Sequence, residues 1–182
     1  MNFTYNRRRA YLYARRWAYR RNPLFYNYSG IGGNCTNFVS QCIYAGCCAM
    51  NFTETFGWYY LSDADRTASW TGVQFLYNFL TSNTANGPYG EEVPIDMLNV
   101  GDVVQLRNEE GVYYHSLIVT GRDSEILVAS HSNDVLDRPL STYDFADVRG
   151  IRIIGYRADV ECGCFLPLYD GEELIICDRP ER

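Results

Sequence analysis

The chain has 182 residues, 47% of them hydrophobic and 21% charged, which is enough apolar material to bury the core of one domain. This composition excludes a disordered or fibrous chain, and no apolar run reaches the roughly 20 residues that a membrane span requires. The formal net charge of −6 argues against a dedicated nucleic-acid-binding protein, for which a basic domain is expected.

The first part of the chain is nevertheless basic. Residues 1–53 contain seven arginines and no acidic residue. Such a stretch could contact nucleic acid, lipid head groups or an anionic wall polymer, although a solvated arginine face on an amphipathic helix is the simpler interpretation. Because the segment lacks the continuous apolar stretch of a secretory signal, we expect the chain as given to be cytoplasmic. Export of a longer natural protein is left open.

The cysteine content points to free thiols rather than to a metal site. Seven cysteines leave at least one unpaired, and without a secretory signal a reducing compartment is expected. Cys47-Cys48 and Cys162-x-Cys164 lack the paired spacing of a zinc ribbon, and neither histidine lies near them in sequence. We therefore expect no metal and no other cofactor.

Apolar residues at helical spacing predict three helices in the first half of the chain. The first is carried by Ala10, Tyr13, Ala14 and Trp17 and is stopped by Pro23. The other two are expected over Cys35–Ala45, with Gly46 as the stop signal, and over Ser69–Leu80.

From Gly101 onward, short segments rich in Val, Ile and Tyr alternate with turn residues and predict antiparallel strands. These segments are Asp102–Leu106, Tyr113–Thr120, Ile126–His131 and Ile151–Tyr156. Helices followed by strands predict one α+β domain over residues 1–158. Residues 159–182 are predicted to be a C-terminal extension packed on that domain, with a hairpin formed by Phe165–Tyr169 and Leu174–Cys177.

Cys35 is the first candidate for chemistry because it stands at the start of the second predicted helix, after two glycines and Asn34. A thiol at that point experiences the positive end of the helix, which favours its thiolate. The free backbone N–H groups there could hold the oxyanion of a tetrahedral intermediate, with Asn34 as cap or support. The alternative for Cys35 is an inert, buried thiol.

The two histidines of the chain are predicted to meet on one face of a hairpin. A three-residue loop at Arg122-Asp123-Ser124 places His115 directly opposite His131, with Leu117 opposite Ala129. One imidazole acting as base and the other as its orienter is a common arrangement, while hydrogen-bonded core histidines are the alternative. The orienting role could also belong to Asn133 or Asp134.

The segment GGNCTNFVSQCIYAG, which contains Cys35, resembles the signature of the putative amidase domain family. This family is a bacterial branch of the papain-like superfamily related to NlpC-type cell-wall peptidases. Further matching blocks are RNPLFY before that segment and VGDVVQL, YYHSLIVTG, ILVASHSND and DRPLS after it. The resemblance covers about Tyr11 to Ile154 and departs from the family at Asn34, where Asp is usual.

The resemblance implies a papain-like, NlpC-type fold with N-terminal helices packed on an antiparallel sheet. It also implies a cysteine amidase or peptidase that hydrolyses peptide or amide bonds of the bacterial cell wall, peptidoglycan included. Cys35 is then the nucleophile, His115 the base and His131 the orienter, with Asn34 and Asn133 as possible oxyanion or supporting groups. Cys162, Cys164 and Cys177 lie outside the resemblance and have no assigned role.

Two other functions are compatible with these residues. The same thioester intermediate could pass to an amine or alcohol, as in an acyltransferase. A non-catalytic module could instead bind the wall or nucleic acid through its arginine-rich first helix.

Overall fold

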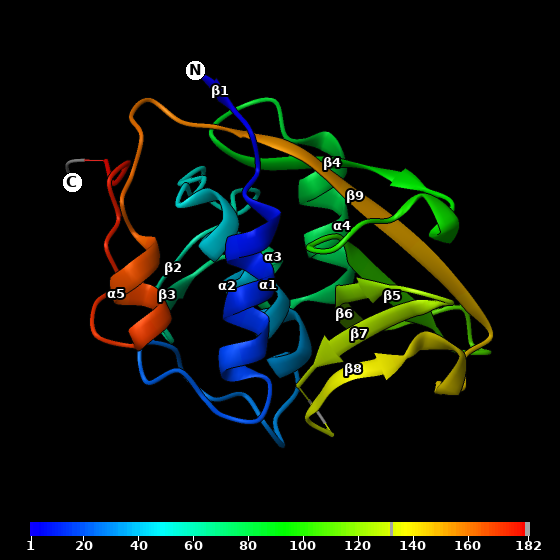
Figure 1. Ribbon diagram of the computed structural model, residues 1–182. Coiled ribbons are helices and arrows are strands. Elements are labelled where there is room, and N and C mark those ends of the chain that lie inside the picture. The colour runs from blue at the N-terminus through cyan, green and yellow to red at the C-terminus, as the bar shows by residue number, and fades with distance from the viewer. Residues whose placement is uncertain (132, 181–182) are drawn as a thin grey trace.

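The computed structural model describes residues 1–131 and 133–180, so the last two residues of the predicted extension lie outside the described part. Its architecture is α+β, as predicted, with helices in the first half of the chain and an antiparallel sheet in the second. Figure 1 shows the helices gathered on one side of the molecule and the sheet on the other, with β9 (Asp147–Arg157) running along both.

The helices of the first half form a layer against the sheet (Figure 1). They are α1 (Arg7–Trp17), α2 (Asn34–Cys47), α3 (Ala68–Thr71) and α4 (Val73–Ser82). The third predicted helix is divided into α3 and α4, because Gly72 has an extended conformation with φ −107° and ψ 127°. Among the helices in the described part of the chain, none is long and apolar enough to cross a bilayer.

Helix α2 is buried along its whole length. It packs against α1, α3, the sheet strand β6 (Tyr113–Arg122) and α5 (Phe165–Asp170), so no face is left for solvent. Gly46 was expected to stop this helix but lies within it, and a Cβ built there would be 2.2 Å from Cε2 of Tyr5. The glycine is thus explained by close packing, and the helix ends instead at Cys48, which adopts a left-handed conformation.

The described residues form a seven-stranded sheet and a separate two-stranded one. The large sheet has the order β1-β9-β5-β6-β7-β8, and β4 also pairs with β9. Its strands not yet located are β1 (Asn2–Phe3), β4 (Gly87–Val93), β5 (Val103–Arg107), β7 (Ile126–Ser130) and β8 (Val135–Pro139). The small sheet pairs β2 (Tyr60–Ser62) with β3 (Asp65–Arg66), and the 3₁₀ turns are η1 (Ile95–Met97) and η2 (Leu140–Thr142).

The two faces of the large sheet bury different cores. Val103 and Ile118 belong to the core shared with the helices. Val104 and Leu117 belong to a second core, which Leu140 helps to close. Alternation along each strand sends neighbouring side chains to opposite cores.

The predicted register of the β6–β7 hairpin is wrong. Arg122 pairs with Ile126, and an irregularity between Val119 and Gly121 then sets Ile118 opposite Ala129. A bulge of this kind adds a residue to one strand and shifts every pair beyond it. Strand β7 also ends at Ser130, so His131 lies beyond the strand and is not paired with His115.

The C-terminal extension is a helix and a loop rather than a hairpin. Phe165–Asp170 form α5, which ends at Gly171 with φ 74°, the left-handed conformation that glycine adopts without strain. The disulfide Cys48–Cys164 attaches the extension to the rest of the domain, and Cys162–Cys177 closes a loop within the extension. The expectation of uniformly free thiols is therefore wrong, since among the described residues the free cysteines are Cys35, Cys42 and Cys47.

Replacing Cys48 and Cys164 together by alanine should lower the free energy of unfolding by about 2–5 kcal/mol, because this cross-link closes a long loop. Urea unfolding followed by tryptophan fluorescence measures the change. Wild-type protein treated with reductant should lose at least as much stability as the double variant. An equal stability of the variant and the oxidised wild type would contradict the prediction.

Candidate functional site

Cys35 lies in the first turn of α2 and is 7% exposed. The N-cap residue of this helix is Gly33, which has φ 95° and supplies no side-chain cap. Because the first N–H groups of a helix have no partner within the helix, the backbone N–H of Cys35 is available to an external acceptor. A Cβ at position 33 would lie 3.1 Å from the carbonyl oxygen of Thr71, so a side chain there would be both strained and crowded.

His115 lies near the start of β6, opposite Leu106 of β5, and is 9% exposed. Its ring faces the rings of Tyr114 and Tyr143, each with a centroid 6.1 Å away. Burial lowers the pKa of His115 to about 4, and the positive charge of Arg138 adds to the effect. The imidazole is therefore neutral at pH 7, and among the described residues no group forms a hydrogen bond to it.

Cys35 and His115 line the same cavity, which has a volume of about 420 Å³. Its other lining residues are Gly32, Gly33, Tyr114, Asn133, Arg138, Tyr143 and Asp144. This volume is within the range of small-molecule sites. The start of the buried helix and the start of a central strand thus bring a thiol and a neutral imidazole to one open space.

His131 has a different position from the one predicted. Its Nε2–H donates to the carbonyl oxygen of Trp17 at 2.9 Å, and its Nδ1 accepts from Nδ2 of Asn34 at 3.0 Å. The ring stacks on Phe38 with centroids 4.0 Å apart, and burial lowers the pKa of His131 to about 4. A neutral imidazole has one donor and one acceptor, so neither remains to orient His115. His131 instead joins the end of α1 to the start of α2.

Asn34 also has its side chain committed within the fold. It was expected to cap α2, but Gly33 is the N-cap residue and Asn34 is the first residue of the helix. Its Oδ1 accepts from the backbone N–H of Tyr28 at 3.1 Å, and its Nδ2 donates to His131. The Asn34 side chain therefore fixes the helix start and is not among the groups that line the cavity.

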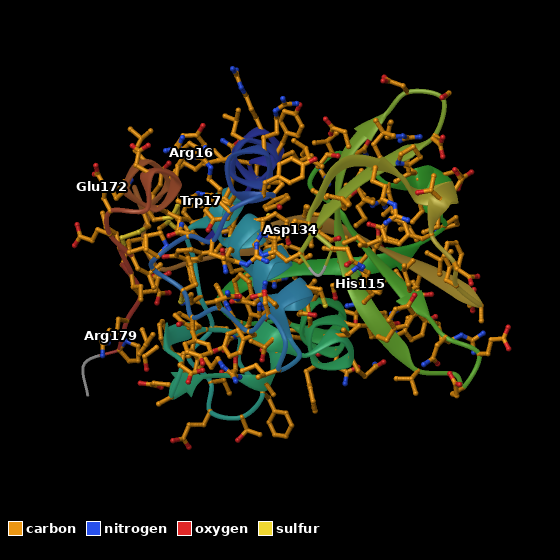
Figure 2. The ribbon with its side chains drawn as sticks, turned by 90° about the horizontal axis from the view of Figure 1, so that it is seen from below. Arg16, Trp17, His115, Asp134, Glu172 and Arg179 are labelled. Carbon is orange, nitrogen blue, oxygen red and sulfur yellow. A yellow bond between two sulfur atoms is a disulfide. The ribbon has the colours of Figure 1, made fainter. Side chains whose placement is uncertain are left out.

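The other two candidates for the orienting role differ from each other. Asp134 forms a two-pronged ion pair with Arg21, with N–O distances of 2.9 and 3.0 Å. Figure 2 labels Asp134 and His115 at separate places, which agrees with the absence of Asp134 from the cavity lining. Asn133 is exposed, has φ 65° and lines the cavity. Of the residues predicted for this role, Asn133 is the one that lines the same cavity as Cys35 and His115.

Sequence reasoning missed four polar or aromatic residues of the cavity. Arg138 comes from β8, a strand that was not predicted, and Tyr143 and Asp144 follow η2. Arg138 belongs to the matching block DRPLS, which was a signal for its importance but not for its position. Tyr114 precedes His115 on β6.

The arginines of the first helical region mainly contact acidic and aromatic side chains of the same domain. Arg7 forms an ion pair with the fully buried Asp102, with Nη1 and Oδ1 2.6 Å apart. Arg15 pairs with Asp137 at 3.5 Å, and Arg16 lies over the ring of Trp17. These contacts favour a solvated, locally paired face over a dedicated anion-binding site.

A protein-family comparison gives this geometry a context. The model of a family described as a putative amidase domain matches residues 4–154. The chain belongs to this amidase family. A curated relative, the uncharacterized protein YhbB of Bacillus subtilis (strain 168), is 32% identical over 124 residues, which are 66% of this chain and 39% of that protein. The chain thus matches well under half of that relative's length, and no solved structure matches it.

Lowering the pH from 7 to 5 should destabilise the fold through its two buried histidines. Each has a pKa of about 4 in the folded protein against an ordinary value of 6.5. The unfolded chain therefore binds more protons than the folded protein in this range. As the pH is lowered from 7 to 5, the free energy of unfolding decreases by about 1–2 kcal/mol per histidine. Urea unfolding of wild type, His115→Gln and His131→Gln at both pH values measures it.

Each single variant should lose less stability than wild type between pH 7 and 5, because one imidazole that resists protonation has been removed. Carboxylates that titrate in the same range are common to all three proteins and cancel in the comparison. An identical pH-dependent loss in wild type and both variants would contradict the low histidine pKa values.

Proposed function

We propose that this chain is a cysteine-nucleophile amide hydrolase with a papain-like arrangement, in which Cys35 attacks the substrate and His115 is the base. The observation that carries the proposal is the shared cavity, which is lined both by a thiol at a helix start and by an imidazole from a strand. Membership of an amidase family supports the reaction class. A helix layer packed on an antiparallel sheet is compatible with a papain-like, NlpC-type fold.

Cys35 is distinguished from every other cysteine by its position. Four cysteines are held in disulfides. Burial raises the pKa of the Cys42 thiol well above 9 and that of Cys47 to about 12, so neither provides a thiolate at neutral pH. Cys35 is the free cysteine that lines the cavity.

The proposed reaction proceeds through a thioester. The neutral His115 takes the thiol proton of Cys35, and the sulfur bonds to the amide carbonyl carbon while the backbone N–H of Cys35 holds the oxyanion. The C–N bond then breaks, and His115 returns the proton to the leaving amine. Water, deprotonated by His115, then attacks the thioester carbon. The C–S bond breaks and His115 returns the proton to sulfur, so that a carboxylic acid leaves and the thiol is restored.

We assign the supporting roles by position. Asn133 lines the cavity and is the candidate to orient His115. His131 acts through Asn34, to which it is hydrogen-bonded, and is therefore a positioning residue for the helix that carries Cys35. This differs from a triad in which the second histidine contacts the first.

The proposed substrate is a peptide or amide of the bacterial cell wall, in keeping with the family resemblance. Two disulfides support action in an oxidising compartment outside the cytoplasm, because disulfides persist there and are rare in reducing cytosol. The proposed location differs from the cytoplasmic one expected from the N-terminal sequence.

The decisive experiment is digestion of soluble bacterial peptidoglycan fragments in ¹⁸O-labelled water, with products followed by mass spectrometry. Wild type should release new amines and carboxylates that carry one ¹⁸O atom. Cys35→Ala and His115→Gln should each lower the rate by about 10³-fold or more, because they remove the nucleophile and its base.

Cys42→Ala is the matched control, since it removes another buried free thiol, and it should retain activity. Products joined to an added amine acceptor instead of ¹⁸O would indicate the acyltransferase. Cleavage by Cys35→Ala at the wild-type rate would refute the cysteine mechanism.

A further inference from the structure

Arg138 is held at the wall of the cavity by contacts that leave part of its guanidinium group unused. Its Nε donates to Oγ1 of Thr142 at 2.8 Å, and its Nη2 donates to the Thr142 carbonyl oxygen at 2.9 Å. The guanidinium carbon lies 3.9 Å from the centroid of the Tyr143 ring. These contacts fix one edge and one face, while no described residue accepts a hydrogen bond from Nη1.

The charge of Arg138 is not neutralised by a carboxylate among the described residues. Other arginines, such as Arg7 and Arg21, form ion pairs with aspartates. Asp144 also lines the cavity but forms no ion pair with Arg138, and its carbonyl oxygen accepts from the Tyr114 hydroxyl. A fixed guanidinium with free donors, in the same cavity as the proposed nucleophile and base, is suited to bind a carboxylate through two hydrogen bonds.

We infer that Arg138 binds a substrate carboxylate, so that the preferred substrates are amides with a free carboxylate close to the scissile bond. This inference rests on the proposed function of Cys35 and His115, and it specifies the substrate class of that site. Arg138 shares one cavity with both residues, so a carboxylate bound by its guanidinium would lie in the same cavity as the reacting carbonyl group.

The electrostatics of the cavity support this assignment. Arg138 is the charged group that lowers the pKa of His115, after burial itself. A carboxylate on Arg138 would offset that positive charge and make His115 a stronger base once substrate is bound. A neutral substrate would leave the charge in place. The same contact would therefore favour acidic substrates in binding and in proton transfer.

The test uses two alkylating reagents of nearly equal shape, iodoacetate and iodoacetamide. The first carries a negatively charged carboxylate where the second carries a neutral amide. In both cases the Cys35 sulfur displaces iodide from carbon and forms a thioether. The measured quantity is the ratio of the two rates at Cys35, at pH 7, divided by the same ratio for glutathione. Wild type should show a preference for iodoacetate of about tenfold or more, the size of one charge-assisted hydrogen bond.

Arg138→Gln should reduce this ratio to about that of glutathione, whereas Arg138→Lys, which keeps the charge, should retain part of it. Arg8→Gln is the matched control, since Arg8 is exposed and does not line the cavity, and it should leave the ratio unchanged. His115→Gln should keep the preference for iodoacetate. This result would show that the preference comes from Arg138 and not from a protonated His115. In wild type, about 0.5 M NaCl should weaken the preference by screening, a readout that needs no variant.

The possible failures are distinguishable. Equal normalised rates for the two reagents in wild type, or an unchanged ratio in Arg138→Gln, would refute the role of Arg138 and leave the cysteine mechanism standing. Labelling of Cys35 no faster than that of Cys42 and Cys47 by either reagent would refute the proposed function, and this inference with it.

Discussion

The burial of α2 on every side is the constraint on which the site depends. A helix with a solvated face can rotate or shift by small amounts, but one packed against helices and sheet has no such freedom. Its first turn is further fixed by the link from Asn34 through His131 to the carbonyl oxygen of Trp17. Buried polar groups that lose a partner cost about 1–3 kcal/mol, so this link also disfavours other positions of the helix start.

The same packing explains the state of the catalytic candidates. His115 lies where β6 passes the start of α2, since Thr36 and Ser116 are hydrogen-bonded there, and burial keeps its imidazole uncharged at neutral pH. A neutral imidazole can accept a proton from a thiol. The thiolate–imidazolium pair that results is buried, however, and solvent stabilises it little. The nearby charge of Arg138 would therefore matter for the proposed proton transfer.

Much of the fold could be predicted from local sequence patterns, whereas register and tertiary contacts could not. The helical spacing of apolar residues located α1 and α2, and Cys35 at the start of α2 followed from the glycines before it. The position of His131 could not be predicted because it depends on where the hairpin loop begins, on an irregularity between Val119 and Gly121, and on the end of β7 at Ser130. The alternation of inward and outward side chains along a strand does not indicate where a β-bulge inserts an extra residue.

The tail shows a second limit of local patterns. The pair Asp170-Gly171 is compatible with a hairpin turn and equally with the end of a helix, and the packing of Gly171 against Trp17 accompanies the second outcome. Cysteine pairing likewise depends on distances between segments far apart in sequence, such as Cys48 and Cys164, which are separated by 116 positions. The number of cysteines alone indicates only that at least one of the seven is outside an intramolecular disulfide.

The contact between Gly46 and Tyr5 has a consequence for how this protein can vary or be redesigned. Every other amino acid adds an atom where the tyrosine ring already lies, 2.2 Å away, so a substitution at position 46 has to displace either the ring or the helix. The helix carries Cys35 three turns earlier in the chain. If Cys35 has the proposed role, a mutational library that samples position 46 would lose function through displacement of a distant sulfur atom, and selection for activity should retain glycine there unless position 5 changes with it.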